Sequence, residues 1–160
     1  GRIDHAHHFS NAFRALGDTV ALSEAVQWVV DNVDLSETLI LVTADHSHTM
    51  TISGYPRPGN PILGTVEMEP GKPMLDATGK PYTTLSYANG PGYRKQRPDL
   101  SDVDTQARNF QQLGTVPMQA ETHAGEDVAA FATGANATAV RGVMEQNRLF
   151  NVMYDALFEQ

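Results

Sequence analysis

Apolar residues recur at steps of three and four positions between residues 9 and 33, a pattern typical of an amphipathic helix. A short turn leads into the run TLILVT at residues 38–43, which is rich in Leu, Ile and Val. Such a run predicts a strand covered on both faces, as in a parallel sheet. A helix followed by such a strand indicates an α/β domain. The predicted apolar face of the helix consists of Phe13, Leu16, Val20, Ala21, Ala25, Trp28, Val29 and Val33.

The chain changes character at residues 54–114, where Gly and Pro occur every few positions. Regular structure there must be short, so we expect loops with two or three strands, one of them at residues 83–87. A loop-rich insertion of this size usually covers a site or meets a partner. After it, the sequence predicts a short strand at residues 127–132 and an amphipathic closing helix at residues 143–158.

Composition narrows the possible functions. The 160 residues suffice for one ordinary domain, and the net charge of −8 argues against nucleic acid as a specific partner. No apolar run is long enough to span a bilayer. The chain has no cysteine, so a metal ion would have to be held by His, Asp or Glu.

All six histidines fall in three short clusters, each with a carboxylate nearby: DHAHH at 4–8, DHSH at 45–48 and ETHAGED at 121–127. A single histidine is more often a satisfied polar residue than a metal ligand, and an Asp before a helix is usually an N-cap. By that interpretation Asp4 is a cap, and His5, His7 and His8 form a solvated first turn. The grouping of all six histidines favours metal binding instead.

The spacing within the clusters suits metal ligands. Asp4 and His8 are four residues apart, so in a helical turn they lie on one face. Asp45 and His46 follow the predicted strand at its carboxyl end, where open α/β sheets place their ligands. His123 precedes Ala-Gly, a tight loop that presents a lone imidazole. Nitrogen and oxygen ligands without sulfur suit Zn²⁺, with Mn²⁺ or Co²⁺ as alternatives. Five candidates exceed the needs of one catalytic zinc, which favours two ions.

The motifs GRIDHAHH, VTADHSH and ETHAGEDVA, in this order and with these separations, resemble those of the alkaline phosphatases. ISGYPRPGNPILG, YANGPGY and GVMEQNRLFNVM are similar to intervening and closing stretches of that family. The resemblance implies an α/β fold, as the C-terminal part of a three-layer α/β/α sandwich with a loop-rich insertion. Residues 1–160 would then form the C-terminal segment of a single alkaline phosphatase domain, with its insertion at about 54–114.

The resemblance also implies roles for the clustered residues. Asp4, His8 and His123 correspond to ligands of a first zinc, which activates the attacking water. Asp45 and His46 correspond to ligands of a second zinc.

Four further residues of the first two clusters have counterparts in the family. His48 corresponds to a residue that orients a ligating carboxylate. His5 stands where the family has a residue that contacts phosphate through water. Ala6 and His7 have structural counterparts.

The activity implied is hydrolysis of phosphate monoesters by a two-zinc mechanism with a phosphoserine intermediate. The resemblance places the nucleophilic Ser, the phosphate-clamping Arg and most of a Mg²⁺ site upstream of Gly1, so this segment alone is expected to be inactive. Ser47 lies between two histidines, but the family gives that position no nucleophilic role. The resemblance further implies a periplasmic or secreted enzyme that is a homodimer when intact.

Two alternatives remain open at this level. One is another metal-dependent phospho- or sulfo-transfer enzyme of the same superfamily, which would also use Asp-His pairs after strands. The THAGED segment and the Asp4–His8 cluster favour the phosphatase over it. The other is a non-catalytic metal-binding fragment.

Overall fold

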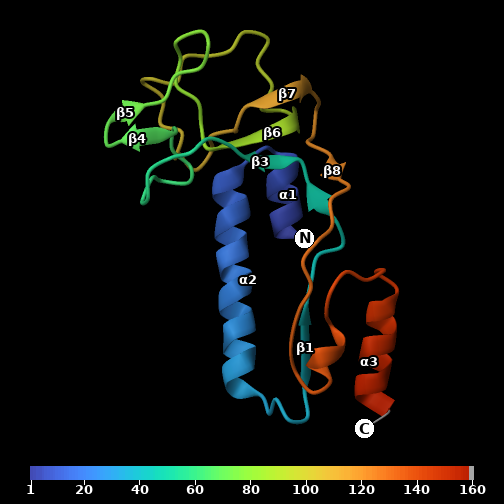
Figure 1. Cartoon of the computed structure of the whole chain (residues 1–160). Helices are drawn as coiled ribbons and strands as arrows, with labels where there is room; N and C mark the ends of the chain where they lie inside the picture. The colour runs from blue at the N-terminus through green and yellow to red at the C-terminus, as the bar shows by residue number, and fades with distance from the viewer. Residues whose placement is uncertain (159–160) are drawn as a thin grey trace. The chain divides into compact units, whose positions relative to one another are not determined.

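The structure, a computed structural model, describes residues 1–158 (Figure 1). It is mixed α/β, and its described strands form small sheets of two or three strands. The three-layer sandwich therefore stays a prediction. The chain divides into two compact units. Unit 1 consists of Gly1–Ala21 and His48–Ala124, and unit 2 consists of Leu22–Ser47 and the described chain from Gly125 onward. Within residues 1–158, no helix is both long and apolar enough to cross a membrane.

Two helices open the chain, α1 (Arg2–His8) and α2 (Ala12–Asn32). Asn11 caps α2, because its Oδ1 accepts a hydrogen bond from the backbone N–H of Arg14 at 2.9 Å. The helix predicted at residues 9–33 is thus confirmed, with a start three residues later.

The apolar face predicted for α2 is wrong. Val20 and Trp28 are 56% and 66% exposed, whereas Ala12 and Ala15 are buried. The covered side is set by tertiary contacts near the start of the helix, where the backbone N–H of Ala12 donates to Oε1 of the buried Gln112 at 2.9 Å.

Unit 1 is built on a three-stranded sheet of β3 (Met50–Ile52), β6 (Leu85–Gly90) and β7 (Gly114–Pro117). The central strand β6 pairs antiparallel with β3 and parallel with β7. It overlaps the strand predicted at residues 83–87 and carries the buried side chains of Leu85 and Tyr87. Most of the described buried apolar side chains belong to this unit: Ala6, Ala12, Ala15, Val66, Leu85, Tyr87 and Leu100.

Residues 54–114 consist mostly of loops with short strands, as their Gly and Pro content predicts, whereas their role as an insertion stays a prediction. The remaining strands there are the short hairpin partners β4 (Glu67–Glu69) and β5 (Lys72–Pro73). Two further short strands, β2 (Ser47–His48) and β8 (His123–Ala124), pair with each other. This pairing brings the rings of His48 and His123 together, with centroids 5.3 Å apart.

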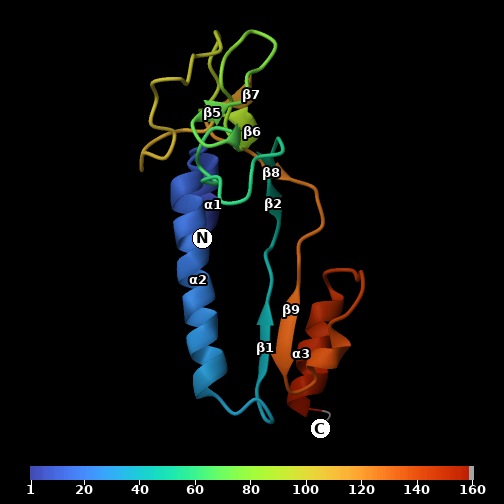
Figure 2. The ribbon, with the colours of Figure 1, turned by 60° about the vertical axis from the view of Figure 1, so that its left-hand side comes forward.

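Unit 2 contains β1 (Leu39–Val42), which pairs antiparallel with β9 (Phe131–Gly134), and Figure 2 shows the two strands side by side. All four residues of β1 are partly exposed. The expectation of a strand covered on both faces, as in a parallel sheet, is therefore wrong for the described chain, since β9 is its one strand partner there. β9 begins four residues later than the strand predicted at residues 127–132.

The unit ends with the 3₁₀ turn η1 (Ala137–Ala139) and the closing helix α3 (Arg148–Phe158). The closing helix was predicted correctly, but it begins five residues later than the apolar pattern indicates.

Candidate metal centre

Asp4 and His8 lie on the same face of α1, as their four-residue spacing predicts. Asp4 Oδ1 and His8 Nε2 are 3.3 Å apart, and both side chains are 29% exposed. The helix thus presents one carboxylate oxygen and one imidazole nitrogen at a single point of its surface.

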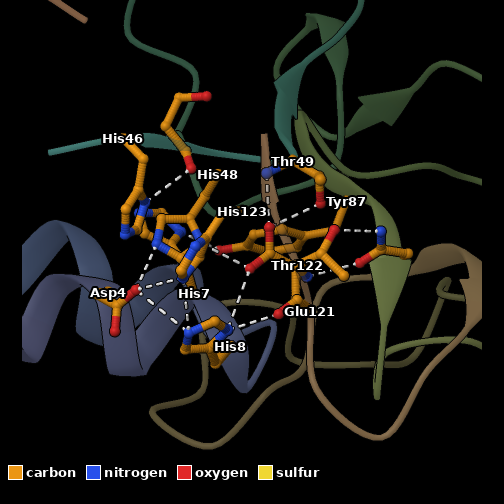
Figure 3. A network of polar contacts seen from close by, with 12 residues as sticks. Asp4, His7, His8, His46, His48, Thr49, Tyr87, Glu121, Thr122 and His123 are labelled. Carbon is orange, nitrogen blue, oxygen red and sulfur yellow. Dashed lines mark hydrogen bonds and ion pairs between the residues drawn. The ribbon is translucent and has the colours of Figure 1, made fainter. Parts of the chain in front are cut away.

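The pairing of β8 with β2 brings a third candidate ligand, the imidazole of His123, to that point. His123 Nε2 lies 3.3 Å from Asp4 Oδ1 and 3.3 Å from His8 Nε2 (Figure 3). The three atoms therefore form an equilateral triangle, although His123 stands 115 residues after His8. The structure brings together all three residues expected to hold the first zinc.

This triangle has the size that zinc requires. Zinc bonds of about 2.0–2.1 Å in a tetrahedral arrangement hold neighbouring ligand atoms about 3.3–3.4 Å apart. Two imidazoles and one carboxylate also form a donor set used by catalytic zinc sites, which leave the fourth position to water or substrate. Zinc fits these residues in donor chemistry and in spacing.

The ring of His8 is fixed in the orientation that metal binding needs. Its Nδ1 lies 2.5 Å from the backbone carbonyl oxygen of Glu121, which can only accept a hydrogen bond. His8 therefore donates its Nδ1 proton there and leaves the Nε2 lone pair facing Asp4 and His123. Metal-ligating histidines commonly donate their second ring N–H to a carbonyl or carboxylate in this way.

The charge distribution keeps Asp4 ionised. Partial burial opposes ionisation, but His8 and His48 outweigh it and hold the pKa of the Asp4 carboxyl below its ordinary value. An ionised carboxylate is the form that binds a metal ion.

His48 lies behind Asp4 and connects it to a carboxylate that the sequence analysis did not single out. Its Nε2 is 3.0 Å from Asp4 Oδ1, and its Nδ1 is 2.7 Å from Oε2 of Glu121 (Figure 3). Glu121 is 1% exposed. The only signal in the sequence was its place two residues before His123, which does not distinguish a buried carboxylate from a surface one.

His7 is buried against the same cluster. Its ring stacks on that of His48, and its Nδ1 lies 2.8 Å from the hydroxyl of the buried Tyr87. Burial and the charge of neighbouring His48 lower the pKa of His7 from 6.5 to about 4, so it is neutral at pH 7. The alternative of a solvated turn is wrong for His7. His5, in contrast, is exposed on α1.

The residues expected to hold the second zinc belong to unit 2. Asp45 is 85% exposed at its side chain, and its Oδ2 lies 3.5 Å from His46 Nε2. His46 Nδ1 is 3.2 Å from the backbone oxygen of Ser47. The Ser47 hydroxyl donates a hydrogen bond to Glu126, which lowers the pKa of that carboxyl. The hydroxyl proton of Ser47 is therefore already donated to the Glu126 carboxylate.

The structure is thus a mixed α/β chain with a candidate metal centre, in which two imidazoles and a carboxylate form a triangle in front of a partly buried His48 and a buried Glu121. The sequence model of the alkaline phosphatase family matches residues 1–158, and the chain belongs to that family.

Similar proteins include the tissue-nonspecific alkaline phosphatase isozymes of Felis catus and Gallus gallus, at 42% and 44% identity over 156 residues. Alkaline phosphatase 4 of Drosophila melanogaster is 44% identical over 170 residues. Each alignment covers 96% of this chain. The chain spans 28–29% of the length of these relatives.

Proposed function

We propose that this chain supplies zinc ligands to an enzyme that hydrolyses phosphate monoesters by a two-zinc, phosphoserine mechanism. The observation that supports it most is the 3.3 Å triangle of Asp4 Oδ1, His8 Nε2 and His123 Nε2. Membership of the alkaline phosphatase family supports the choice of reaction. The nucleophilic Ser of the proposal lies outside these 160 residues.

In this proposal Asp4, His8 and His123 hold the first zinc, and Asp45 and His46 hold the second. Zinc supplies Lewis acidity toward phosphoryl oxygens and lowers the pKa of a bound water from 15.7 to about 7.

The protein residues contribute orientation and charge. His8 keeps its Nε2 lone pair toward the ion, because its Nδ1 proton is bound to the Glu121 carbonyl. His48 holds one carboxylate oxygen of Asp4 at 3.0 Å and so limits rotation of that side chain. His5, exposed on the same helix, contacts the phosphate of the substrate through water.

The proposal extends to the intact protein. In this proposal the intact protein is a homodimer of three-layer α/β/α subunits and is periplasmic or secreted. It also carries a Mg²⁺ site, which is formed mostly by residues outside this chain. Its substrates are phosphate monoesters. These features are supported by the membership of the chain in the alkaline phosphatase family.

Metal analysis tests the ligand assignment. The zinc content of the intact protein is measured beside that of Asp45→Ala and His123→Ala variants, each of which is expected to lose about one equivalent. Asp102→Ala is the matched control, because Asp102 is exposed and lies outside the three clusters. Full zinc content in both ligand variants would contradict the assignment.

A rate measurement tests the proposal that the zinc ligands lie within these 160 residues and the nucleophilic Ser lies outside them. The 160 residues expressed alone should hydrolyse a generic aryl phosphate no faster than buffer, whereas the intact protein should hydrolyse it in a zinc-dependent manner. Clear turnover by the 160 residues would refute the placement of the nucleophile. A zinc-replete intact protein without turnover would favour a non-catalytic metal-binding role.

A further inference from the structure

Glu121 has more contacts with the candidate metal centre than any role assigned so far explains. Its backbone N–H donates to the His8 carbonyl at 2.9 Å, and its own carbonyl accepts from His8 Nδ1 at 2.5 Å. Its side chain contacts His48, which contacts Asp4. One residue thus touches His8 directly and reaches Asp4 through a single intermediate ring.

The carboxylate of Glu121 is fully committed to protein partners. Oε1 accepts from the backbone N–H of Thr49 at 2.6 Å and from the Thr49 hydroxyl at 2.8 Å, while Oε2 faces His48 Nδ1 at 2.7 Å. The side chain is fully buried. Although Glu121, His8 and His48 lie close enough together to hold an ion, the three contacts of Glu121 suit a support better than a ligand.

The backbone around Glu121 is also fixed from the side of the insertion. Thr122, the residue after Glu121, makes two hydrogen bonds with Asn89 on β6. The Oδ1 of Asn89 accepts from the Thr122 N–H at 2.9 Å, and its Nδ2 donates to the Thr122 hydroxyl at 2.8 Å. Gly90 follows Asn89 on the same strand, and a Cβ placed on Gly90 would lie 2.9 Å from the Cβ of Glu121. The segment that carries His123 is therefore held against strand β6 of unit 1 by hydrogen bonds and close packing.

We propose that Glu121 is a positioning residue for the first zinc site, holding His8 through its backbone and Asp4 through His48. This inference rests on the proposed function, since it assumes that Asp4, His8 and His123 bind zinc. Carboxylates that orient ligands in this manner change metal affinity by about 10–100-fold when they are replaced. The role adds a residue of the ETHAGED cluster that the resemblance did not assign.

The test uses the intact protein with Glu121→Gln, which keeps the shape of the side chain but removes the negative charge facing His48. Zinc affinity is measured by competition with a chelator, and Co²⁺ is substituted to record the visible spectrum of the bound metal. We expect one of two metal equivalents to bind about 10–100-fold more weakly, with an altered Co²⁺ spectrum. Glu24→Gln, on the exposed side of α2, is the matched control and should change neither quantity.

The outcomes separate this inference from the proposed function. If Glu121→Gln folds and both its zinc affinity and its Co²⁺ spectrum equal those of the unsubstituted protein, the positioning role is refuted and the zinc site stands. If the unsubstituted protein binds no zinc, the proposed function fails and the inference fails with it.

A second variant covers the case in which Glu121→Gln does not fold. Thr49→Val removes one of the three hydrogen bonds to the carboxylate and preserves the side-chain shape. It should weaken the binding of one zinc equivalent at least about threefold, which is less than the effect of removing the charge, because two of the three hydrogen bonds to the carboxylate remain. Unchanged affinity in this variant also refutes the role.

Discussion

The imidazole rings of His7 and His48 stack on each other, with centroids 4.7 Å apart and planes inclined by 25°. His48 also contacts Asp4 and Glu121, so His7 packs against a residue of the candidate metal centre. On its other side His7 is hydrogen-bonded to Tyr87 in the middle of the central strand β6. The stack connects the metal centre to the core of unit 1.

The His7–Tyr87 hydrogen bond can be measured by a double-mutant cycle. His7→Phe keeps a ring against His48 but leaves the buried Tyr87 hydroxyl unpaired, and Tyr87→Phe leaves His7 Nδ1 unpaired. Each should lower the free energy of unfolding by about 1–3 kcal/mol, and the double variant should cost less than the sum. Urea unfolding of the intact protein measures all four species. Strictly additive costs would show that the two side chains do not interact.

Protonation of His7 should make the protein sensitive to acid. Burial and the charge of His48 lower the pKa of His7 to about 4, whereas in the unfolded chain the pKa is about 6.5. As the pH falls from 6.5 to 4, the unfolded state takes up a proton that the folded state does not, so stability decreases over this window. The stability advantage of the unsubstituted protein over His7→Phe should therefore shrink between pH 6.5 and pH 4. A pH-independent difference in urea unfolding would contradict this.

A second pH-dependent effect is predicted at Asp76, in the loop-rich part of the chain between residues 54 and 114. Oδ1 accepts hydrogen bonds from the hydroxyl and backbone N–H of Thr78 at 2.7 and 2.8 Å, and Oδ2 pairs with Arg97 at 2.6 Å. The Thr78 hydroxyl is the main cause that lowers the pKa of Asp76 to about 2.

The stability that the ionised Asp76 carboxylate contributes is present above its ordinary pKa of 3.8 and is lost as the pH falls toward 2. Carboxyl chemical shifts in an NMR titration should give a midpoint near 2, and Thr78→Val should raise it toward 3.8. The same midpoint in both proteins would exclude the Thr78 hydroxyl as the cause.

Gly90 is the glycine whose replacement should disturb the metal centre. Its φ of +124° is strained for other residues, and an added Cβ would lie 2.6 Å from Ser10 Oγ and 2.9 Å from Glu121 Cβ. Gly90→Ala should lower stability by about 2–4 kcal/mol and weaken zinc binding, since Glu121 must move.

Gly71→Ala is the matched control, because Gly71 also has a positive φ of +73° but no neighbour within 4 Å of the added Cβ. It should cost about 1–2 kcal/mol through backbone strain alone and leave zinc affinity unchanged. Thermal unfolding and chelator competition measure both effects. Equal zinc affinity in the two variants would show that Gly90 does not position Glu121.

Much of the candidate site could be predicted because its elements are local. Asp4 and His8 share one turn of helix, and the 3.6-residue period places them on one face without any other part of the chain. The histidine clusters and the absence of cysteine restricted the metal ligands to imidazole and carboxylate. The order of the motifs indicated the alkaline phosphatase family, whose sequence model matches residues 1–158.

The burial of polar side chains could not be predicted in the same way. The partners of the Glu121 carboxylate stand 72 and 73 residues away in the chain, and His7 meets Tyr87 across 80 residues. The wrong apolar face of α2 has the same origin, since Gln112 meets Ala12 across 100 residues.

The sequence by itself determined which chemical groups are available to a metal ion and that α1 presents two of them together. Tertiary structure decided that His123 completes a 3.3 Å triangle with them, and that Glu121 is the buried carboxylate behind it. The physical reason for this difference is that the spacing of side chains on a helix follows from the local geometry of the backbone. The environment of a carboxylate depends on strands and loops that only the folded chain brings around it.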